Sequence, residues 1–415
     1  MIKNHIVYNP ILEYKFTLQK AVGSLLWTKE GKRLIDFTSG WNIANLGWNH
    51  PEITAAITDQ LAKNTYTPSW IADEMQISYA DSLTKALPHE LNAICRVTSG
   101  TEANEQAIKI ARTVTGRQKI LGFFDTYHGS TYASLSLGYR PEYLQNLSPV
   151  VGEMIHLEYP KLSLGCDVES VRVKFLSALE EVLSHQDVAA ILTEAGIITG
   201  WGSLSVSPPE FLSDIRRLTT KYGTLLILDE VGTGFSRTGS LFAFEQTGVT
   251  PDILTLAKAM SNGVAAIGAC ITSADLIEGH VPAAKVLSSL AWMPLGCAAA
   301  AKALEIHLRD KVGETTKQAG SYLTKRLRNL TKMTPAYIRG QGLEIGIDFL
   351  KYSDDKESFN YVSAIAKACF DRGLLVNQSD AATLQLMPPL NTSQPLFVEA
   401  CDILAEAVEF TDKTH

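Results

Sequence analysis

Short apolar runs alternate with longer amphipathic stretches through the middle of the chain. Between about residues 90 and 275 the runs are rich in Val, Ile and Leu, which is typical of strands buried on both faces of a parallel sheet. The stretches between them have the length and spacing of helices. This pattern predicts an α/β domain with a largely parallel central sheet, whose strands lie at Ala93–Val97, Lys119–Phe124, Ala189–Leu192, Leu225–Leu228, Ile253–Leu256 and Ala266–Ile271.

The two ends of the chain have a different pattern. The first 50 residues contain short β-like pieces, and after about residue 300 helices mix with one strand region. These elements are expected at Gly23–Trp27, Arg33–Phe37, Ala298–Arg309, Gly342–Phe349, Ser358–Arg372 and Gln394–Phe410. We therefore expect residues 51–305 to form the large domain, and residues 1–50 and 306–415 to supply a small α+β domain.

Composition and charge narrow the class of protein. The chain has 415 residues, of which 46% are apolar and 20% charged, and its net charge is −7. These values are those of an ordinary globular protein, and the acidic balance argues against a nucleic-acid or anionic membrane partner. The longest apolar stretch, Leu290–Ala301, is too short to span a bilayer, and Met1–Pro10 lacks the features of a signal peptide.

The six cysteines are widely spaced and include no CxxC pair, which argues against a zinc ribbon or a thioredoxin-like site. Most of them lie within apolar runs, as buried free thiols do in a reducing compartment. We expect a cytoplasmic protein without a metal site.

Polar residues follow the predicted strands at the edge of the sheet where ligands bind in open α/β folds. Ser99-Gly100-Thr101-Glu102 opens a helix, Tyr127-His128-Gly129 forms a turn, and Glu194, Asp229 and Lys258 each follow a strand.

Each of these features also has a simpler, non-functional interpretation. Ser99 and Glu102 form a capping box, the aromatic turn is a common turn, and Asp229-Glu230 caps a helix or binds a metal. Lys258 lies between two alanines beyond a buried strand, where an unused charge would be costly.

Taken in order along the chain, these residues resemble the class III aminotransferases, which are pyridoxal-phosphate enzymes of fold type I. The resemblance extends from Gly23-Ser24-Leu25-Leu26-Trp27 to Pro388-Pro389-Leu390. It is most specific at 226–239, which reads LILDEVGTGFSRTG, and at 251–258, which reads PDILTLAK.

The resemblance implies a role for each of these residues. Lys258 and Asp229 would be catalytic: Lys258 would bind pyridoxal 5'-phosphate as an aldimine and move a proton, and Asp229 would keep the pyridine nitrogen protonated. The resemblance also implies that Gly100 and Thr101 bind the phosphate of the cofactor. Tyr127 would stack on one face of its ring and Val231 would pack on the other. Ser289 matches a hydroxyl that reaches the phosphate of the neighbouring subunit, which implies a homodimer with shared active sites.

Departures from the family pattern lie around the substrate. Gln385 stands where the family has an arginine that clamps a carboxylate, and Ser130 and Gly232 replace an arginine and a glutamine. Glu194 matches an acidic residue at the mouth of the substrate pocket, and without that arginine it would lack its usual partner. Trp41 matches an aromatic wall of the pocket, although a core position in the small domain would explain it equally well.

We therefore expect an aminotransferase that moves an amino group between a primary amine or amino acid and an oxo acid or aldehyde, through pyridoxamine phosphate. A racemase, aminomutase or phospho-lyase on the same scaffold is the alternative, followed by a non-catalytic protein of this fold. The missing clamp predicts a donor whose reacting carbon bears no carboxylate, unless another arginine such as Arg140 replaces it.

Overall fold

The computed structural model describes residues 2–3, 6–7, 16–138, 144–147, 149–200, 204–280, 287–378 and 382–414. Its centre is a seven-stranded sheet in the order β6-β14-β13-β12-β9-β7-β8. The strands are β6 (Ala93–Val97), β7 (Lys119–Phe123), β8 (Met154–Leu157), β9 (Val188–Glu194), β12 (Leu225–Asp229), β13 (Ile253–Leu256) and β14 (Gly268–Thr272). The predicted α/β architecture is confirmed, since all six predicted strands are present.

Two features of this sheet differ from the sequence prediction. β14 runs antiparallel to both of its neighbours, β13 and β6, whereas the remaining pairs are parallel. β8 was not predicted, because each of its four residues is only partly buried, as suits a short strand at the edge of the sheet.

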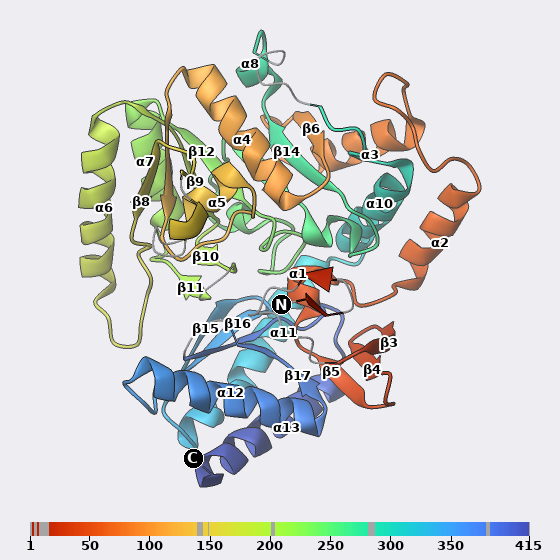
Figure 1. The fold of residues 1–415 in the computed structure, drawn as a ribbon, viewed down its shortest axis with the longest axis vertical. Helices are drawn as coiled ribbons and strands as arrows, with labels where there is room; N and C mark the ends of the chain where they lie inside the picture. The colour runs from red at the N-terminus through yellow and green to blue at the C-terminus, as the bar shows by residue number, and fades with distance from the viewer. Residues whose placement is uncertain are drawn as a thin grey trace.

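Helices cover both faces of the sheet (Figure 1). One face packs on α4 and α5, through a cluster that contains Ala107 and Leu137. The other packs on α3, α6, α7 and α10, through a cluster that contains Leu83, Leu179 and Leu304. The bounds are α3 (Glu74–Lys85), α4 (Gly100–Thr115), α5 (Tyr132–Gly138), α6 (Val168–Ser184), α7 (Phe211–Tyr222) and α10 (Pro294–Arg309). The three layers hold the carboxyl ends of the parallel strands in fixed positions.

A smaller α+β unit is built from both ends of the chain, as predicted. Its two four-stranded sheets have the orders β15-β16-β19-β18 and β17-β5-β4-β3. In the second sheet, β17 from the C-terminal part pairs parallel to β5 from the N-terminal part. The strands are β3 (Leu18–Val22), β4 (Leu25–Thr28), β5 (Arg33–Asp36), β15 (Ala336–Gln341), β16 (Glu344–Phe349), β17 (Leu374–Leu375), β18 (Asn377–Gln378) and β19 (Thr383–Leu386). The exact boundaries near residues 50 and 305 stay predictions.

Three long helices, α11, α12 and α13, belong to this lower part of the molecule and share its hydrophobic core (Figure 1). The remaining elements are short or peripheral. The bounds are α11 (Val312–Leu327), α12 (Asp355–Arg372), α13 (Gln394–Thr414), α1 (Ser39–Asn42), α2 (Pro51–Leu61), α8 (Ala274–Ile277), β1 (Ile2–Lys3), β2 (Ile6–Val7), β10 (Ile197–Ile198) and β11 (Ser205–Val206). Among the described helices, none combines the length and the apolar character needed to cross a membrane.

Arg237 joins the two units. Its side chain is fully buried, and its guanidinium donates to the carbonyls of Leu343 and Pro388 at 3.1 and 2.7 Å and to Asn45 Oδ1 at 2.7 Å. Burial lowers the pKa of Arg237 to about 10, and the charge of Glu344 opposes this shift. The large-domain loop that holds Arg237 is therefore tied to both terminal segments at one point.

Candidate active site

Three parallel strands bring their carboxyl ends together at the predicted edge of the sheet. Asp229 ends β12, and the register places it beside Glu194 of β9 and Thr255 of β13. Lys258 lies three residues after Thr255 and begins a 3-10 helix, Lys258–Ser261. The alternation of strand and helix thus places two carboxylates and an amine on one edge.

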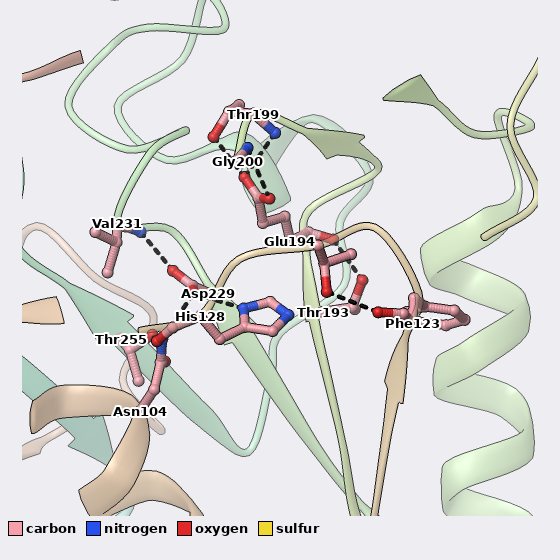
Figure 2. Close-up of polar contacts among 11 residues, drawn as sticks. Asn104, Phe123, His128, Thr193, Glu194, Thr199, Gly200, Asp229, Val231 and Thr255 are labelled. Carbon is pink, nitrogen blue, oxygen red and sulfur yellow. Dashed lines mark hydrogen bonds and ion pairs between the residues drawn. The ribbon is translucent and has the colours of Figure 1, made fainter. Parts of the chain in front are cut away.

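Asp229 is the centre of a buried hydrogen-bond network (Figure 2). Its Oδ2 accepts from Asn104 Nδ2 at 2.7 Å and lies 2.8 Å from His128 Nδ1, while its Oδ1 accepts from the Val231 backbone N–H at 2.9 Å. Asn104 Oδ1 in turn accepts from the Thr255 hydroxyl at 2.7 Å. Because a carboxylate has about four acceptor positions, Asp229 is held in place with capacity for one further donor.

Sequence reasoning did not identify His128 and Asn104 as site residues. His128 lies in the turn to which we assigned a role only for Tyr127. Asn104 is a buried polar residue within the apolar face of α4. A buried polar residue on an apolar helix face was the one available signal. His128 Nε2 is buried without a hydrogen-bond partner in the described part of the chain.

The start of α4 lies beside this network. Ser99 Oγ accepts from the Glu102 N–H at 3.2 Å, which is one half of the predicted capping box, whereas the Glu102 carboxylate accepts from the N–H of Thr98, the residue before the N-cap, at 2.7 Å. A Cβ added to Gly100 would lie 2.7 Å from Val231 Cγ1. Only glycine therefore allows Val231 to pack this closely, and the first N–H groups of the helix remain available to an anion.

The turn after β7 packs against the same helix start. A Cβ on Gly129, whose φ is +146°, would lie 2.8 Å from the methyl group of Thr101. A Cβ on Gly200 would lie 2.9 Å from Tyr127 Cβ and 3.5 Å from Glu194 Oε1. Thr101, Tyr127 and Glu194 therefore border the same region as Gly100 and Val231.

Lys258 has a strained backbone. Its φ is +42°, a conformation that costs a residue with a Cβ about 1–3 kcal/mol and that clusters at functional sites. The side chain is half-buried, and no described residue forms a hydrogen bond with its amine. Burial raises the pKa of Glu344, and the charge of Lys258 is the smallest of the effects that oppose this shift.

Glu194 has hydrogen-bond partners in the protein, whereas the absence of the family's arginine led us to expect an unpaired carboxylate. Its Oε2 accepts from the Thr199 N–H at 2.9 Å and from the Thr199 hydroxyl at 2.5 Å (Figure 2). Only 2% of its surface is exposed. Burial, and next the charge of Asp229, raise the pKa of Glu194 to about 7, although the bonds from Thr199 oppose the shift.

Gln385 is also fully buried, and its amide nitrogen donates to protein partners, whereas its Oε1 has no hydrogen-bond partner in the described part of the chain. Its Nε2 donates to the Thr199 carbonyl at 3.2 Å and to Glu344 Oε1 at 2.8 Å, while Asn42 Nδ2 donates to Glu344 Oε2 at 2.7 Å. A continuous chain of contacts thus runs from Glu194 to Glu344. Sequence analysis missed Glu344 because it treated this segment only as a strand.

Trp41 lies in an unusual turn. The φ angles of Ser39, Gly40, Trp41 and Asn42 are 47, 59, 70 and 62°, so four successive residues are left-handed. Such a run is costly for residues with a Cβ. The Ser39 hydroxyl donates to the Met387 carbonyl at 2.7 Å and accepts from Arg237 at 3.2 Å, which braces the turn.

The remaining predicted positions are less central in this chain. Ser289 lies in an exposed turn before α10 and forms no hydrogen bond with any other described residue of the predicted site. Ser130 is exposed, and Arg140 lies outside the described residues.

A Cβ on Gly232 would lie 2.1 Å from Thr199 Oγ1, so a glutamine there would displace Thr199. In the described part of the chain, no group of three His, Cys, Asp or Glu side chains could hold a metal ion.

Comparisons with known proteins identify the family to which the chain is similar. The model of the aminotransferase class-III family matches residues 8–408. An acetylornithine aminotransferase from Methanosarcina mazei is 32% identical, with 94% of this chain and 91% of the relative covered. A 5-aminovalerate aminotransferase from Pseudomonas putida is 30% identical, with 91% and 89% covered. The structure of a taurine:2-oxoglutarate aminotransferase from Bifidobacterium kashiwanohense, in complex with PLP and glutamate, aligns with a TM-score of 0.89 at 26% identity, covering 96% of this chain and 93% of that one.

Proposed function

Because the chain belongs to the class III aminotransferase family, it is a pyridoxal-phosphate-dependent aminotransferase, and we propose which of its residues carry the reaction. Lys258 would bind the cofactor covalently, Asp229 would hold a proton on its ring nitrogen, and Gly100 and Thr101 would bind its phosphate. The observation that carries this assignment is the buried hydrogen-bond network around Asp229. Asp229 ends β12, which pairs with β13, the strand that precedes Lys258.

The residues present fit this cofactor. Asp229 retains an acceptor position for a protonated ring nitrogen, and the start of α4 offers N–H groups to a dianionic phosphate. Gly100 leaves room for the Val231 side chain, which would pack on one ring face, and Tyr127 borders the region on another side. When bound, the cofactor supplies an aldehyde that captures an amino group and a ring that accepts an electron pair.

The residues of this chain supply the proton chemistry. The Lys258 amine would act as the general acid and base that moves a proton, once it is released from the cofactor. The carboxylate of Asp229 holds a proton on the ring nitrogen. Because a carboxylate only accepts, His128 Nδ1 carries the hydrogen of the His128–Asp229 bond, which fixes the orientation of Asp229.

A homodimer with shared active sites completes the proposal. Ser289 is exposed, and the flanking Leu287 and Leu290 are 78% and 58% exposed, as is expected of apolar residues that a second subunit covers. We propose that Ser289 donates to the phosphate bound by the neighbouring subunit. We also propose a cytoplasmic location, since all six cysteines are free thiols.

The substrate proposal follows from Gln385. A guanidinium would bind a carboxylate through two parallel hydrogen bonds, whereas the Gln385 amide already donates to Thr199 and Glu344. Glu344 accepts from this amide and Glu194 lies beyond Thr199, and both carboxyl groups repel anions when they are ionised. We therefore propose a donor whose reacting carbon carries no carboxylate, bordered by Trp41 and Tyr127. The 5-aminovalerate relative is named for such an amine.

Single half-reactions test both proposals. The holoenzyme is mixed with butylamine, with its carboxylated counterpart norvaline, or with the diamine putrescine, and conversion to the pyridoxamine form is followed by absorbance. We expect faster conversion with the amines than with norvaline. No conversion with any donor would contradict transamination itself. A preference for norvaline that disappears in Arg140→Ala would overturn only the substrate proposal and identify Arg140 as a replacement clamp.

A further inference from the structure

One face of the sheet β15-β16-β19-β18 is turned towards the large domain and carries polar residues. The register pairs Gly346 of β16 with Gln385 of β19, and because side chains alternate along a strand, Glu344 lies on the same face. Ile345 points the opposite way, into the hydrophobic core of the smaller unit. A Cβ on Gly346 would lie 3.3 Å from Leu204 Cβ, so the face of Glu344 and Gln385 packs against the large domain.

Glu344 and the Thr199 carbonyl fix the orientation of the Gln385 amide. Both are acceptors, and both bond to Gln385 Nε2, at 2.8 and 3.2 Å. The nitrogen therefore stays on their side, and Gln385 Oε1 is left buried without a partner among the described residues. Asn42 is in the same situation, since its Nδ2 donates to Glu344 at 2.7 Å while its Oδ1 has no partner there. Two buried amide oxygens next to a carboxyl group thus lack a donor.

The negative charge in this region is incompletely balanced. The charge of Arg237 acts on two buried carboxyl groups, Glu344 and Asp36, so it offsets only one of their two charges when both are ionised. Arg339 of β15 lies on the same sheet face, but it is already paired with Asp348. A positive charge on a substrate would improve the balance, whereas a negative charge would add to the excess.

Glu344 lies near the proposed reacting groups but below the surface. The charge of Lys258 acts on Glu344, and Asn42, which donates to Glu344, directly follows Trp41, a proposed border of the donor. Glu344 is fully buried, whereas Trp41 and Lys258 are half-buried. Because buried charges are screened much less than exposed ones, Glu344 can influence a donor without touching it.

We propose that Glu344 is a specificity-determining residue of the aminotransferase site. It holds Gln385 with the amide oxygen free to accept and adds a negative charge, so the site favours a donor with a second ammonium group, such as a linear diamine, over a donor with a distal carboxylate. Glu344 acts through Gln385 and through its charge, and is therefore a positioning residue, not a catalytic one. This inference rests on the proposed function, because it concerns the far end of the same donor.

Three donors that differ only at the far end test the inference. Pentylamine, putrescine and 5-aminovalerate carry a methyl group, an ammonium group and a carboxylate after the same chain of methylene groups. The holoenzyme is mixed with each, and conversion to the pyridoxamine form is followed by absorbance. We expect the highest second-order rate constant with putrescine and the lowest with 5-aminovalerate. A parent enzyme that reacts with pentylamine but does not prefer putrescine would overturn this inference alone, whereas no conversion with any donor would overturn the proposed function as well.

Glu344→Gln removes the charge at nearly constant shape, and its new amide group can donate to a reoriented Gln385 or Asn42 oxygen. The ratio of the rate constants for putrescine and pentylamine should fall about tenfold, as expected for loss of a charged partner. A purely structural role would slow both donors alike, and an unchanged ratio would overturn the inference. Glu180→Gln, which removes an exposed negative charge on α6, is the matched control and should keep the parent ratio. If circular dichroism shows that Glu344→Gln does not fold, the order of the three donors in the parent decides.

Discussion

His128 Nδ1 lies 2.8 Å from Asp229 Oδ2, with 0% and 4% of the two side chains exposed. The pair connects the turn after β7 to the end of β12, so the aromatic turn and the acidic residue form one unit. A buried hydrogen bond to a charged group contributes about 1.5–3 kcal/mol.

His128→Ala should therefore lower kcat roughly 10–100-fold with a smaller effect on KM, because Asp229 loses a partner that orients it. His128→Asn should recover part of the loss, since its amide can donate from nearly the same position. Steady-state kinetics measure both variants. His156→Gln, which changes a second histidine that is half-buried, serves as a control that should leave kcat unchanged. Equal kcat in His128→Ala and the parent would refute the positioning role.

Lys258→Ala should abolish covalent attachment of the cofactor and reduce turnover by at least ~10²–10⁴-fold, the usual contribution of general acid–base catalysis. Borohydride reduction followed by mass spectrometry detects attachment directly. Replacement of the exposed Lys109 by alanine should leave both properties intact. Near-normal turnover in Lys258→Ala would remove the central assignment.

Hybrid dimers test the shared site. If Ser289 serves the neighbouring subunit, a dimer of one Ser289→Ala chain and one Lys258→Ala chain contains one intact site and one site with both lesions. Purified hybrids should then retain about half of the parent activity at full cofactor affinity. If each lesion acts in its own subunit, the active site would instead show the weakened cofactor affinity of Ser289→Ala.

Glu194 should make stability depend on pH. Its pKa is raised from 4.5 to about 7 in the folded protein, so the folded state binds more protons than the unfolded state between these values. Its contribution to the free energy of unfolding is therefore fully present below about pH 4.5 and is lost as the pH rises through about 7.

In Glu194→Gln, whose carbonyl can still accept from Thr199, this loss should be absent. The difference in thermal unfolding midpoint between variant and parent should grow between these two pH values and then level off. Glu180→Gln is the control, because the pKa of this exposed carboxyl is lowered and not raised. A constant difference across the range would contradict the assignment.

The sequence predicts the large sheet well because runs such as Leu225–Leu228 are apolar throughout, and such runs suit few other environments. It does not predict that β14 is antiparallel, since the composition of a buried strand contains no information on its direction. The half-buried β8 lacks even the apolar signal.

Within the site, the residues that follow strands could be predicted from their place in the chain. The partners that the fold adds could not. Thr199 and Gln385, for example, are 186 positions apart, and nothing in either local pattern points to the other. The same holds for Asn104, which meets Asp229 only after the helix and the strand pack together.

The pairing of β17 with β5 has a consequence for how this protein is made. During translation, residues 93–272 of the large sheet leave the ribosome as one continuous stretch and can fold at once. Ile35, however, cannot meet Leu374 until nearly the whole chain has been synthesised. The nascent N-terminal hairpin must wait with an open strand edge, so a truncated chain that lacks the last fifty residues should be a substrate for chaperones and proteases, not a smaller enzyme.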